Sequence, residues 1–165
     1  MLISSGYQEL NAQLHDDRPD YGTSGQKWAQ IVSMLMQEYG CVSVLDYGCG
    51  KRTLERALGF PIKNYDPCIP EFAQAPEPAD LVCCTDVLEH IEPECIDAVL
   101  DDLKRVTGKV AFFTVATGPA KKALPDGRNA HVLQRPPKWW LPNLWERWDL
   151  LAYRDLGPEF MVILK

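Results

Sequence analysis

The segment that decides the fold is Val44-Leu45-Asp46-Tyr47-Gly48-Cys49-Gly50-Lys51. It continues a run, Val42–Tyr47, that lacks clean polar alternation, which is typical of a parallel strand buried on both faces. The two glycines allow the backbone to approach a ligand closely. A short helix is predicted to follow from Arg52 to Leu58, with unpaired N–H groups at its start. The segment therefore predicts a strand, a ligand-binding turn and a helix.

The flanking segments alternate between strand-like and helix-like patterns. Apolar runs predict strands at 62–66, 81–86 and 110–117, and helical spacing of apolar residues predicts helices at 5–15, 26–39 and 93–108. Two further strands, 150–156 and 160–164, read as a closing hairpin joined by Gly157-Pro158. We therefore predict an α/β fold, a Rossmann-like three-layer α/β/α sandwich with a mostly parallel sheet and a C-terminal antiparallel hairpin.

The length of 165 residues predicts one domain, because a chain of this size can bury one core and hardly two. In its first helix, Ser5 and Gln8 can form a capping box. We expect residues 1–25 to act as an N-terminal lid and residues 118–148 to form an insertion on the substrate side.

Composition excludes several classes of protein and site. No apolar run approaches the roughly 18–20 residues of a membrane span. No basic segment followed by a long apolar run stands at the N-terminus, so we expect no signal peptide. The six cysteines include no C-x-x-C pair. We interpret them as reduced thiols of a cytoplasmic protein, with no disulfide framework and no metal site.

The charge is unevenly distributed along the chain. The net charge is −6, yet residues 118–148 carry six basic side chains against two acidic ones. A local basic segment on an acidic body argues against a broad duplex-DNA footprint, which needs many phosphate contacts. It leaves room for a small anionic ligand, for a short piece of nucleic acid, or for an ordinary solvated face.

Asp66 ends the second predicted strand and is placed to accept hydrogen bonds from ribose hydroxyls. The dinucleotide pattern G-x-G-x-x-G fails, because Thr53 stands where its third glycine belongs. Asp46, two residues before the first glycine, would be unfavourable beside a pyrophosphate. It suits a cationic ligand such as a sulfonium with an amino group. These residues predict a nucleoside pocket for a cation.

Three segments resemble class I S-adenosylmethionine-dependent methyltransferases: Val44–Lys51, Tyr65-Asp66-Pro67 and Ala79–Ile91. The resemblance implies an enzyme that uses S-adenosylmethionine. It also implies that the cofactor is held by Asp46, Tyr47, Gly48, Cys49, Gly50, Asp66, Pro67, Thr85, Asp86 and Val87. In that family pattern, Asp46 lies near the amino group, Asp66 holds the ribose and Pro67 flanks the adenine.

The sequence departs from the family at two places. Arg52 stands where the family often has a third glycine, so a cationic side chain is expected at the mouth of the loop. Between Asp66 and Asp80 lie four prolines and too few residues for a helix, a strand and a second helix. We therefore expect the third strand of the family's sheet to be missing. The exposed edge of the second strand would then be a plausible oligomer contact.

Candidates for the transfer step lie in loops beyond the strand ends. His131 is the first choice as a base and His90 the second, although each could instead be a structural histidine. The expected substrate-binding residues are Lys121 and Arg128 for an anionic acceptor, Trp140 for stacking, and His15 and Tyr21 on the lid.

We interpret the chain as a methyltransferase that acts on a small anionic acceptor. One alternative is a nucleic-acid or nucleotide methyltransferase that uses the basic segment. A second alternative is an S-adenosylmethionine-binding module without transferase activity, suggested by Arg52 and the shortened adenine side. Cleavage of the cofactor itself is a third. We expect no membrane partner.

Overall fold

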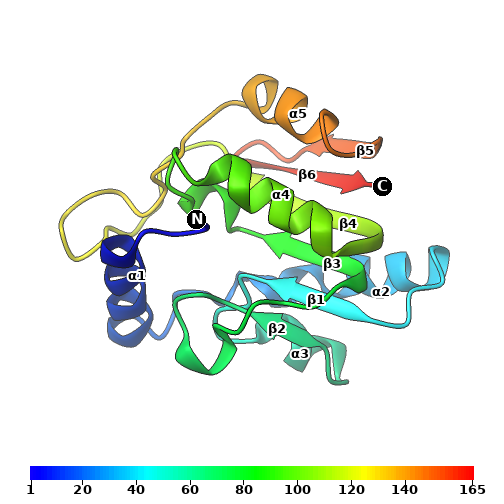
Figure 1. Cartoon of the computed structure of the whole chain (residues 1–165), viewed down its shortest axis with the longest axis horizontal. Helices are drawn as coiled ribbons and strands as arrows, with labels where there is room; N and C mark the ends of the chain where they lie inside the picture. The colour runs from blue at the N-terminus through cyan, green and yellow to red at the C-terminus, as the bar shows by residue number, and fades with distance from the viewer.

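The computed structural model describes residues 1–165 and contains one six-stranded sheet with the order β2-β1-β3-β4-β6-β5 (Figure 1). Its strands are β1 Val44–Tyr47, β2 Lys63–Tyr65, β3 Ala79–Thr85, β4 Thr107–Ala116, β5 Leu150–Asp155 and β6 Glu159–Leu164. The first four pair in parallel, whereas β6 pairs antiparallel with both β4 and β5. The predicted sheet and its C-terminal hairpin are confirmed.

The helices are α1 Ser5–Asp17, η1 Ser24–Trp28, α2 Ala29–Glu38, α3 Thr53–Leu58, η2 Pro70–Phe72, η3 Leu88–His90, α4 Ile96–Val106 and α5 Pro137–Trp145, with η marking 3-10 helices. The predicted capping box of α1 is wrong by one residue. Ser4 is the N-cap, and its hydroxyl accepts a hydrogen bond from the Tyr7 amide at 3.3 Å. The Gln8 side chain instead donates to the carbonyl of Pro67. Helix α4 begins three residues later than predicted, because 93–95 form a turn.

Helices cover both faces of the sheet and make the three predicted layers (Figure 1). The neighbours Cys83 and Cys84 on β3 point to opposite faces, as expected for a strand. Cys84 belongs to the core under α4 and α5, where the largest buried side chain is Trp140. Cys83 belongs to the second core, where Trp28 of η1 packs with α2 and α3. All six cysteines are free thiols.

The third strand of the family's sheet is missing, as predicted. The segment between β2 and β3 contains only the three-residue helix η2. Strand β2 is therefore the edge of the sheet and is itself three residues long. The Lys63 ammonium on this edge lies 2.8 Å from the carbonyl oxygen of Pro78 and 3.5 Å from the Glu77 carboxylate. A short edge that carries a lysine disfavours pairing with another strand.

Helix α1 lies at the edge of the sheet where the parallel strands end (Figure 1). In open α/β sheets this edge is where ligands bind. The topology thus places the N-terminal segment, the glycine turn after β1 and the loops after β2 and β3 together. No helix has the length and apolarity required to cross a membrane.

Candidate functional site

The turn after β1 needs both of its glycines. Gly48 has a φ of 84°, and a Cβ atom there would lie 2.3 Å from Cγ2 of Val87. Gly50 has a φ of 48°, and its Cβ would lie 2.6 Å from the carbonyl oxygen of Gly22. The amides of Gly48 and Cys49 both donate to the carbonyl of Tyr65. The turn is therefore held rigidly against the end of β2, and close approach excludes any side chain at either glycine.

Asp46 has a buried carboxyl group that is not satisfied by the protein. The residue is only 3% exposed, its side chain lines the cavity described below, and no hydrogen bond reaches it from another protein group. Burial raises its pKa to about 7, and the neighbouring Asp66 and Glu55 carboxylates add to this effect. A buried carboxylate without a partner is unfavourable, so binding of a cation next to it would be strongly favoured.

Asp66 joins the two loops of the site. One of its oxygens accepts a hydrogen bond from the Gly50 amide at 3.1 Å, and the other accepts from the Cys68 amide at 3.0 Å. The His15 imidazole lies 3.9 Å away. A carboxylate has about four acceptor positions, so two remain for a ligand.

A cavity of about 210 Å³ lies between these loops and the N-terminal segment. All ten residues predicted to contact the cofactor line it, as do His15, Tyr21 and His90. Sequence analysis missed the contributions of Tyr7 and Asn11. They share one face of α1 at a spacing of four residues, and this spacing is the signal that could have found them.

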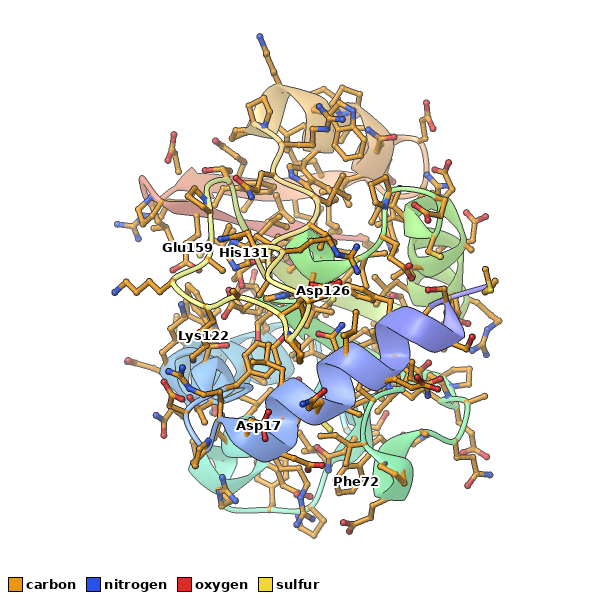
Figure 2. All side chains as sticks on the ribbon, turned by 90° about the vertical axis from the view of Figure 1, so that its left-hand side faces the viewer. Asp17, Phe72, Lys122, Asp126, His131 and Glu159 are labelled. Atoms are coloured by element: carbon orange, nitrogen blue, oxygen red, sulfur yellow. The ribbon has the colours of Figure 1, made fainter.

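Residues of the N-terminal segment line one side of the cavity, and Figure 2 shows α1 in front of the loops at this edge of the sheet. The Tyr7 hydroxyl donates to the carbonyl of His90 at 2.6 Å. The Lys51 ammonium donates to the carbonyl of His15 at 2.7 Å. The Tyr21 hydroxyl donates to the Asn11 side chain and lies 3.3 Å from Nδ1 of His90. These contacts link the segment to loops on both sides of the cavity.

The two histidines predicted as bases differ in position. His90 lines the cavity, whereas His131 does not. The His131 ring packs edge-on against that of His90, with centroids 4.7 Å apart, and is thereby separated from the cavity. Burial, aided by the neighbouring His131, lowers the pKa of His90 to about 4. Burial also lowers the pKa of His15.

The expected substrate residues of the basic segment do not line the cavity. Trp140 requires a correction, because it is completely buried in the core beneath α5, and its indole N–H donates to the carbonyl of Arg135 at 3.1 Å. Arg128 pairs with Asp126 at 2.7 Å, and Lys121 does not reach the cavity. Lys122, the neighbouring cation of the same basic segment, does line it, and Figure 2 shows it on the loop that carries Asp126 and His131.

Arg52 does not enter the cavity. It adopts the left-handed conformation with a φ of 54°, as a glycine would. Its guanidinium lies 5.0 Å from the centroid of the Phe72 ring and 3.6 Å from the Glu55 carboxylate. The side chain that replaces the family's third glycine is thus directed away from the glycine turn, towards η2.

The sequence and the fold of this chain are similar to those of known proteins. The model of a family described as "Methyltransferase domain" matches residues 7–156. No curated protein matches the chain. Similar solved structures include the methyltransferase domain of a bacterial CtHen1, with 15% identity and a TM-score of 0.62 over 85% of this chain and 98% of that one.

Two other similar structures contain the demethylated cofactor. The 1,6-didemethyltoxoflavin-N1-methyltransferase of Burkholderia thailandensis, with its substrate and S-adenosylhomocysteine, has 14% identity and a TM-score of 0.62, covering 86% of this chain and 78% of that one. DhpI in complex with SAH has 14% identity and a TM-score of 0.63, covering 99% and 98%. At such identities the likeness establishes the fold.

Proposed function

Because this chain belongs to the methyltransferase domain family, we propose that it transfers a methyl group from S-adenosylmethionine to a small acceptor that binds next to His90. The observation that carries the proposal is the Asp46 carboxyl, which is buried, lines the cavity and has no hydrogen-bonding partner in the protein. A cationic ligand beside the glycine turn supplies that partner. The amino group of the cofactor's methionine part has the required charge.

The rest of the cofactor fits the remaining groups of the cavity wall. Asp66 keeps two acceptor positions after its bonds to Gly50 and Cys68, and these suit the two hydroxyls of a ribose. Pro67 and Cys68 line the adjoining wall on the side where the adenine would extend. No third strand supplies a side chain that could read the adenine, so we assign recognition chiefly to the ribose and the methionine part.

Methyl transfer depends on the relative position of the two reactants more than on acid or base catalysis by the protein. When bound, S-adenosylmethionine would supply the methyl group from its sulfonium. A lone pair of the acceptor would form the new bond to the methyl carbon as the carbon–sulfur bond breaks. The positive charge would then pass to the methylated acceptor, and a proton carried by the acceptor atom would leave to solvent. Thr85, Asp86 and Val87 line the cavity after β3 and form the wall on which the reacting carbon would rest. Holding the two reactants in line lowers the activation free energy. In well-oriented intramolecular reactions this effect reaches roughly 7–11 kcal/mol, and we expect several kcal/mol here.

The charges of the wall favour an acceptor without net negative charge. Lys122 is the cation that lines the cavity, and it already pairs with Asp20 at 3.2 Å. The carboxyls of Asp46, Asp66 and Asp86 line the same space. An anionic acceptor, expected from the basic segment, would therefore meet more acidic than basic groups.

A labelling experiment tests this proposal. The protein is incubated with methyl-labelled S-adenosylmethionine and, separately, with a low-molecular-weight metabolite fraction and a nucleic-acid fraction. We expect label to move into the metabolite fraction, with one S-adenosylhomocysteine formed per methyl group, and we expect Asp46→Asn to slow the transfer strongly. Label in nucleic acid would support the alternative acceptor class. Loss of the cofactor without any acceptor would indicate cleavage and contradict the proposal.

A further inference from the structure

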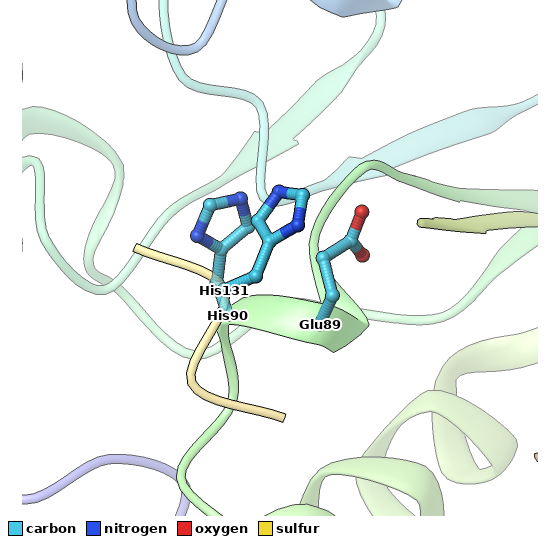
Figure 3. Close-up of side chains that lie close together, drawn as sticks. All are labelled: Glu89, His90 and His131. Carbon is cyan, nitrogen blue, oxygen red and sulfur yellow. The ribbon is translucent and has the colours of Figure 1, made fainter. Parts of the chain in front are cut away.

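Glu89, His90 and His131 come together beside the cavity, and of the three only His90 lines it (Figure 3). Their potential ligand atoms all lie within 4.8 Å of one another. Glu89 and His90 belong to η3, whereas His131 belongs to the loop after β4, so the fold joins residues about forty positions apart. Figure 3 shows the two imidazoles side by side, with the carboxyl group beside them.

Each histidine has one ring nitrogen occupied by a backbone carbonyl. Nδ1 of His90 lies 2.8 Å from the carbonyl oxygen of Ala130, and Nδ1 of His131 lies 2.7 Å from that of Gly118. A carbonyl oxygen can only accept, so Nδ1 carries the proton in both rings. In a neutral imidazole this leaves Nε2 with a free lone pair. Histidines that bind metals commonly have their other nitrogen oriented in this way.

The His90 ring is held in place by two neighbouring aromatic rings. It is enclosed by Tyr21 and His131, whose rings lie 5.7 and 4.7 Å away between centroids. Both hydrogen-bond contacts of its ring involve Nδ1, so Nε2 has no hydrogen-bonding partner in the protein.

Glu89 supplies the second, independent observation. It is completely buried, and one of its oxygens accepts a hydrogen bond from the Ala116 amide at 2.9 Å. Its other oxygen is buried without any hydrogen-bonding partner. The Asp86 carboxyl lies nearby, yet no hydrogen bond of acceptable geometry reaches this oxygen. An unsatisfied buried carboxyl oxygen is costly, and a cation would satisfy it.

We propose that Glu89, His90 and His131 bind a divalent transition-metal ion. Two imidazole nitrogens and one carboxylate suit ions such as Zn²⁺, Mn²⁺, Fe²⁺ or Co²⁺, whereas Mg²⁺ and Ca²⁺ prefer sites made only of oxygen. Ligand atoms that are each about 2.1 Å from an ion lie at most about 4.2 Å apart, so the three side chains would close slightly around it. The expected absence of a metal site rests on cysteine spacing, which says nothing about these donors.

Three protein ligands leave at least one coordination position open. Because His90 also lines the cavity, a molecule bound there is within reach of that position. An oxygen or nitrogen of the acceptor would be oriented by the ion beside the reacting methyl group. This last step rests on the proposed function, whereas metal binding itself does not.

The test uses the full chain without a polyhistidine tag, treated with a chelator and freed of it. Calorimetric titrations with Co²⁺ and Zn²⁺ should each give one ion per chain, with a dissociation constant in the micromolar range or below. Glu89→Gln and His131→Gln should each weaken binding at least about tenfold. His15→Gln removes the third histidine, which lies outside the cluster, and should leave metal binding unchanged.

Circular dichroism verifies that each variant is folded. If Glu89→Gln does not fold, His131→Gln carries the test, because His131 is only half-buried. The inference is overturned if wild type binds neither ion, if His15→Gln weakens binding as much as the other variants, or if the Co²⁺ absorption is that of a thiolate complex. Tighter binding of Mg²⁺ than of Zn²⁺ would also overturn it. S-adenosylhomocysteine is titrated into the same samples, so loss of metal binding is distinguished from failure of the proposed function.

Discussion

The backbones of Gly22 and Gly50 are in direct contact. The Cβ atom that an alanine would place at Gly50 lies 2.7 Å from the Cα atom of Gly22, and the Lys51 amide donates to the Gly22 carbonyl at 2.8 Å. Gly22 itself has a φ of 71°. The main chain of the N-terminal segment thus contacts the main chain of the glycine turn. A shift of one of these segments would displace the other.

This contact predicts that Gly50→Ala impairs cofactor binding. The added methyl group would force the loop around Gly22 away from the turn, and we expect S-adenosylhomocysteine to bind at least about tenfold more weakly, or about 1.4 kcal/mol. Gly40→Ala is the matched control, because Gly40 also has a positive φ, 58°, but nothing lies within 4 Å of its Cβ position. Equal affinities of the two variants in calorimetry would refute the contact's role.

Asp46 predicts that cofactor affinity depends on pH. Its pKa is raised to about 7, and a cationic ligand binds the ionised form. Affinity for S-adenosylmethionine should therefore fall as the pH drops below 7, by up to about tenfold per pH unit, with one proton released on binding. Titrations between pH 5 and 8 in two buffers of different ionisation enthalpy measure both quantities. In Asp46→Asn the residual affinity should be independent of pH, and a wild-type profile that is flat over this range would rule the mechanism out.

The same carboxyl predicts a cost in stability at high pH. Its folded-state pKa lies above the value of about 3.9 in an unfolded chain, so the folded protein binds the extra proton. Stability of the ligand-free protein is then lost as the pH rises from about 4 through 7. We expect Asp46→Asn to raise the melting temperature at pH 8 and to change it little at pH 4. An equal change at both values would contradict the assignment.

The direction of the Arg52 side chain predicts that an arginine here, in place of the family's third glycine, does not weaken cofactor binding. Its guanidinium points towards Phe72, so Arg52→Gly should change S-adenosylhomocysteine affinity by less than about twofold. Relief of the left-handed conformation stabilises the chain by about 1 kcal/mol, and loss of the contact with the Phe72 ring offsets part of this. Chemical denaturation measures the balance. A large gain in affinity would mean that Arg52 obstructs the site.

Substitutions of two tryptophans on α5 should lower the stability of the protein to very different extents. Trp140 is completely buried, whereas Trp145 is 53% exposed. Trp140→Ala should lower the free energy of unfolding by about 3–5 kcal/mol, and Trp145→Ala by less than about 1 kcal/mol. Urea titration followed by circular dichroism gives both values. A small change in unfolding free energy for Trp140→Ala, together with a changed acceptor specificity, would contradict this account. It would support the prediction from the sequence that Trp140 contacts the substrate.

What the sequence predicts well here is local. Asp46, Gly48 and Asp66 could be placed because each lies near or just after the end of a strand that the neighbouring apolar residues predict. The missing strand could be predicted from the length and prolines of one loop. In contrast, the approach of His131 to Glu89 depends on the path of a long loop, and no local pattern encodes it.

Trp140 shows a second kind of error. The helix that carries it contains Pro142, and apolar residues stand on several of its faces, so spacing alone could not tell which tryptophan faces the core. Packing against the sheet decides the matter, and it buries Trp140 while leaving Trp145 exposed. In helix α1, the displacement of the N-cap from Ser5 to Ser4 has a similar origin. The amide and hydroxyl of Ser4 both donate to the distant Glu92 carboxylate, a contact with no local signal.

The central claim is that the cavity beneath the N-terminal segment binds S-adenosylmethionine through the loops after β1 and β2. The most direct measurement is calorimetric titration of S-adenosylhomocysteine into wild type, Asp66→Asn and the exposed control Asp17→Asn. We predict saturable binding to wild type and the control, and a loss of about 1.5–3 kcal/mol in Asp66→Asn, the scale of a lost charged hydrogen bond. No binding to wild type, or equal affinity in all three proteins, would contradict the account.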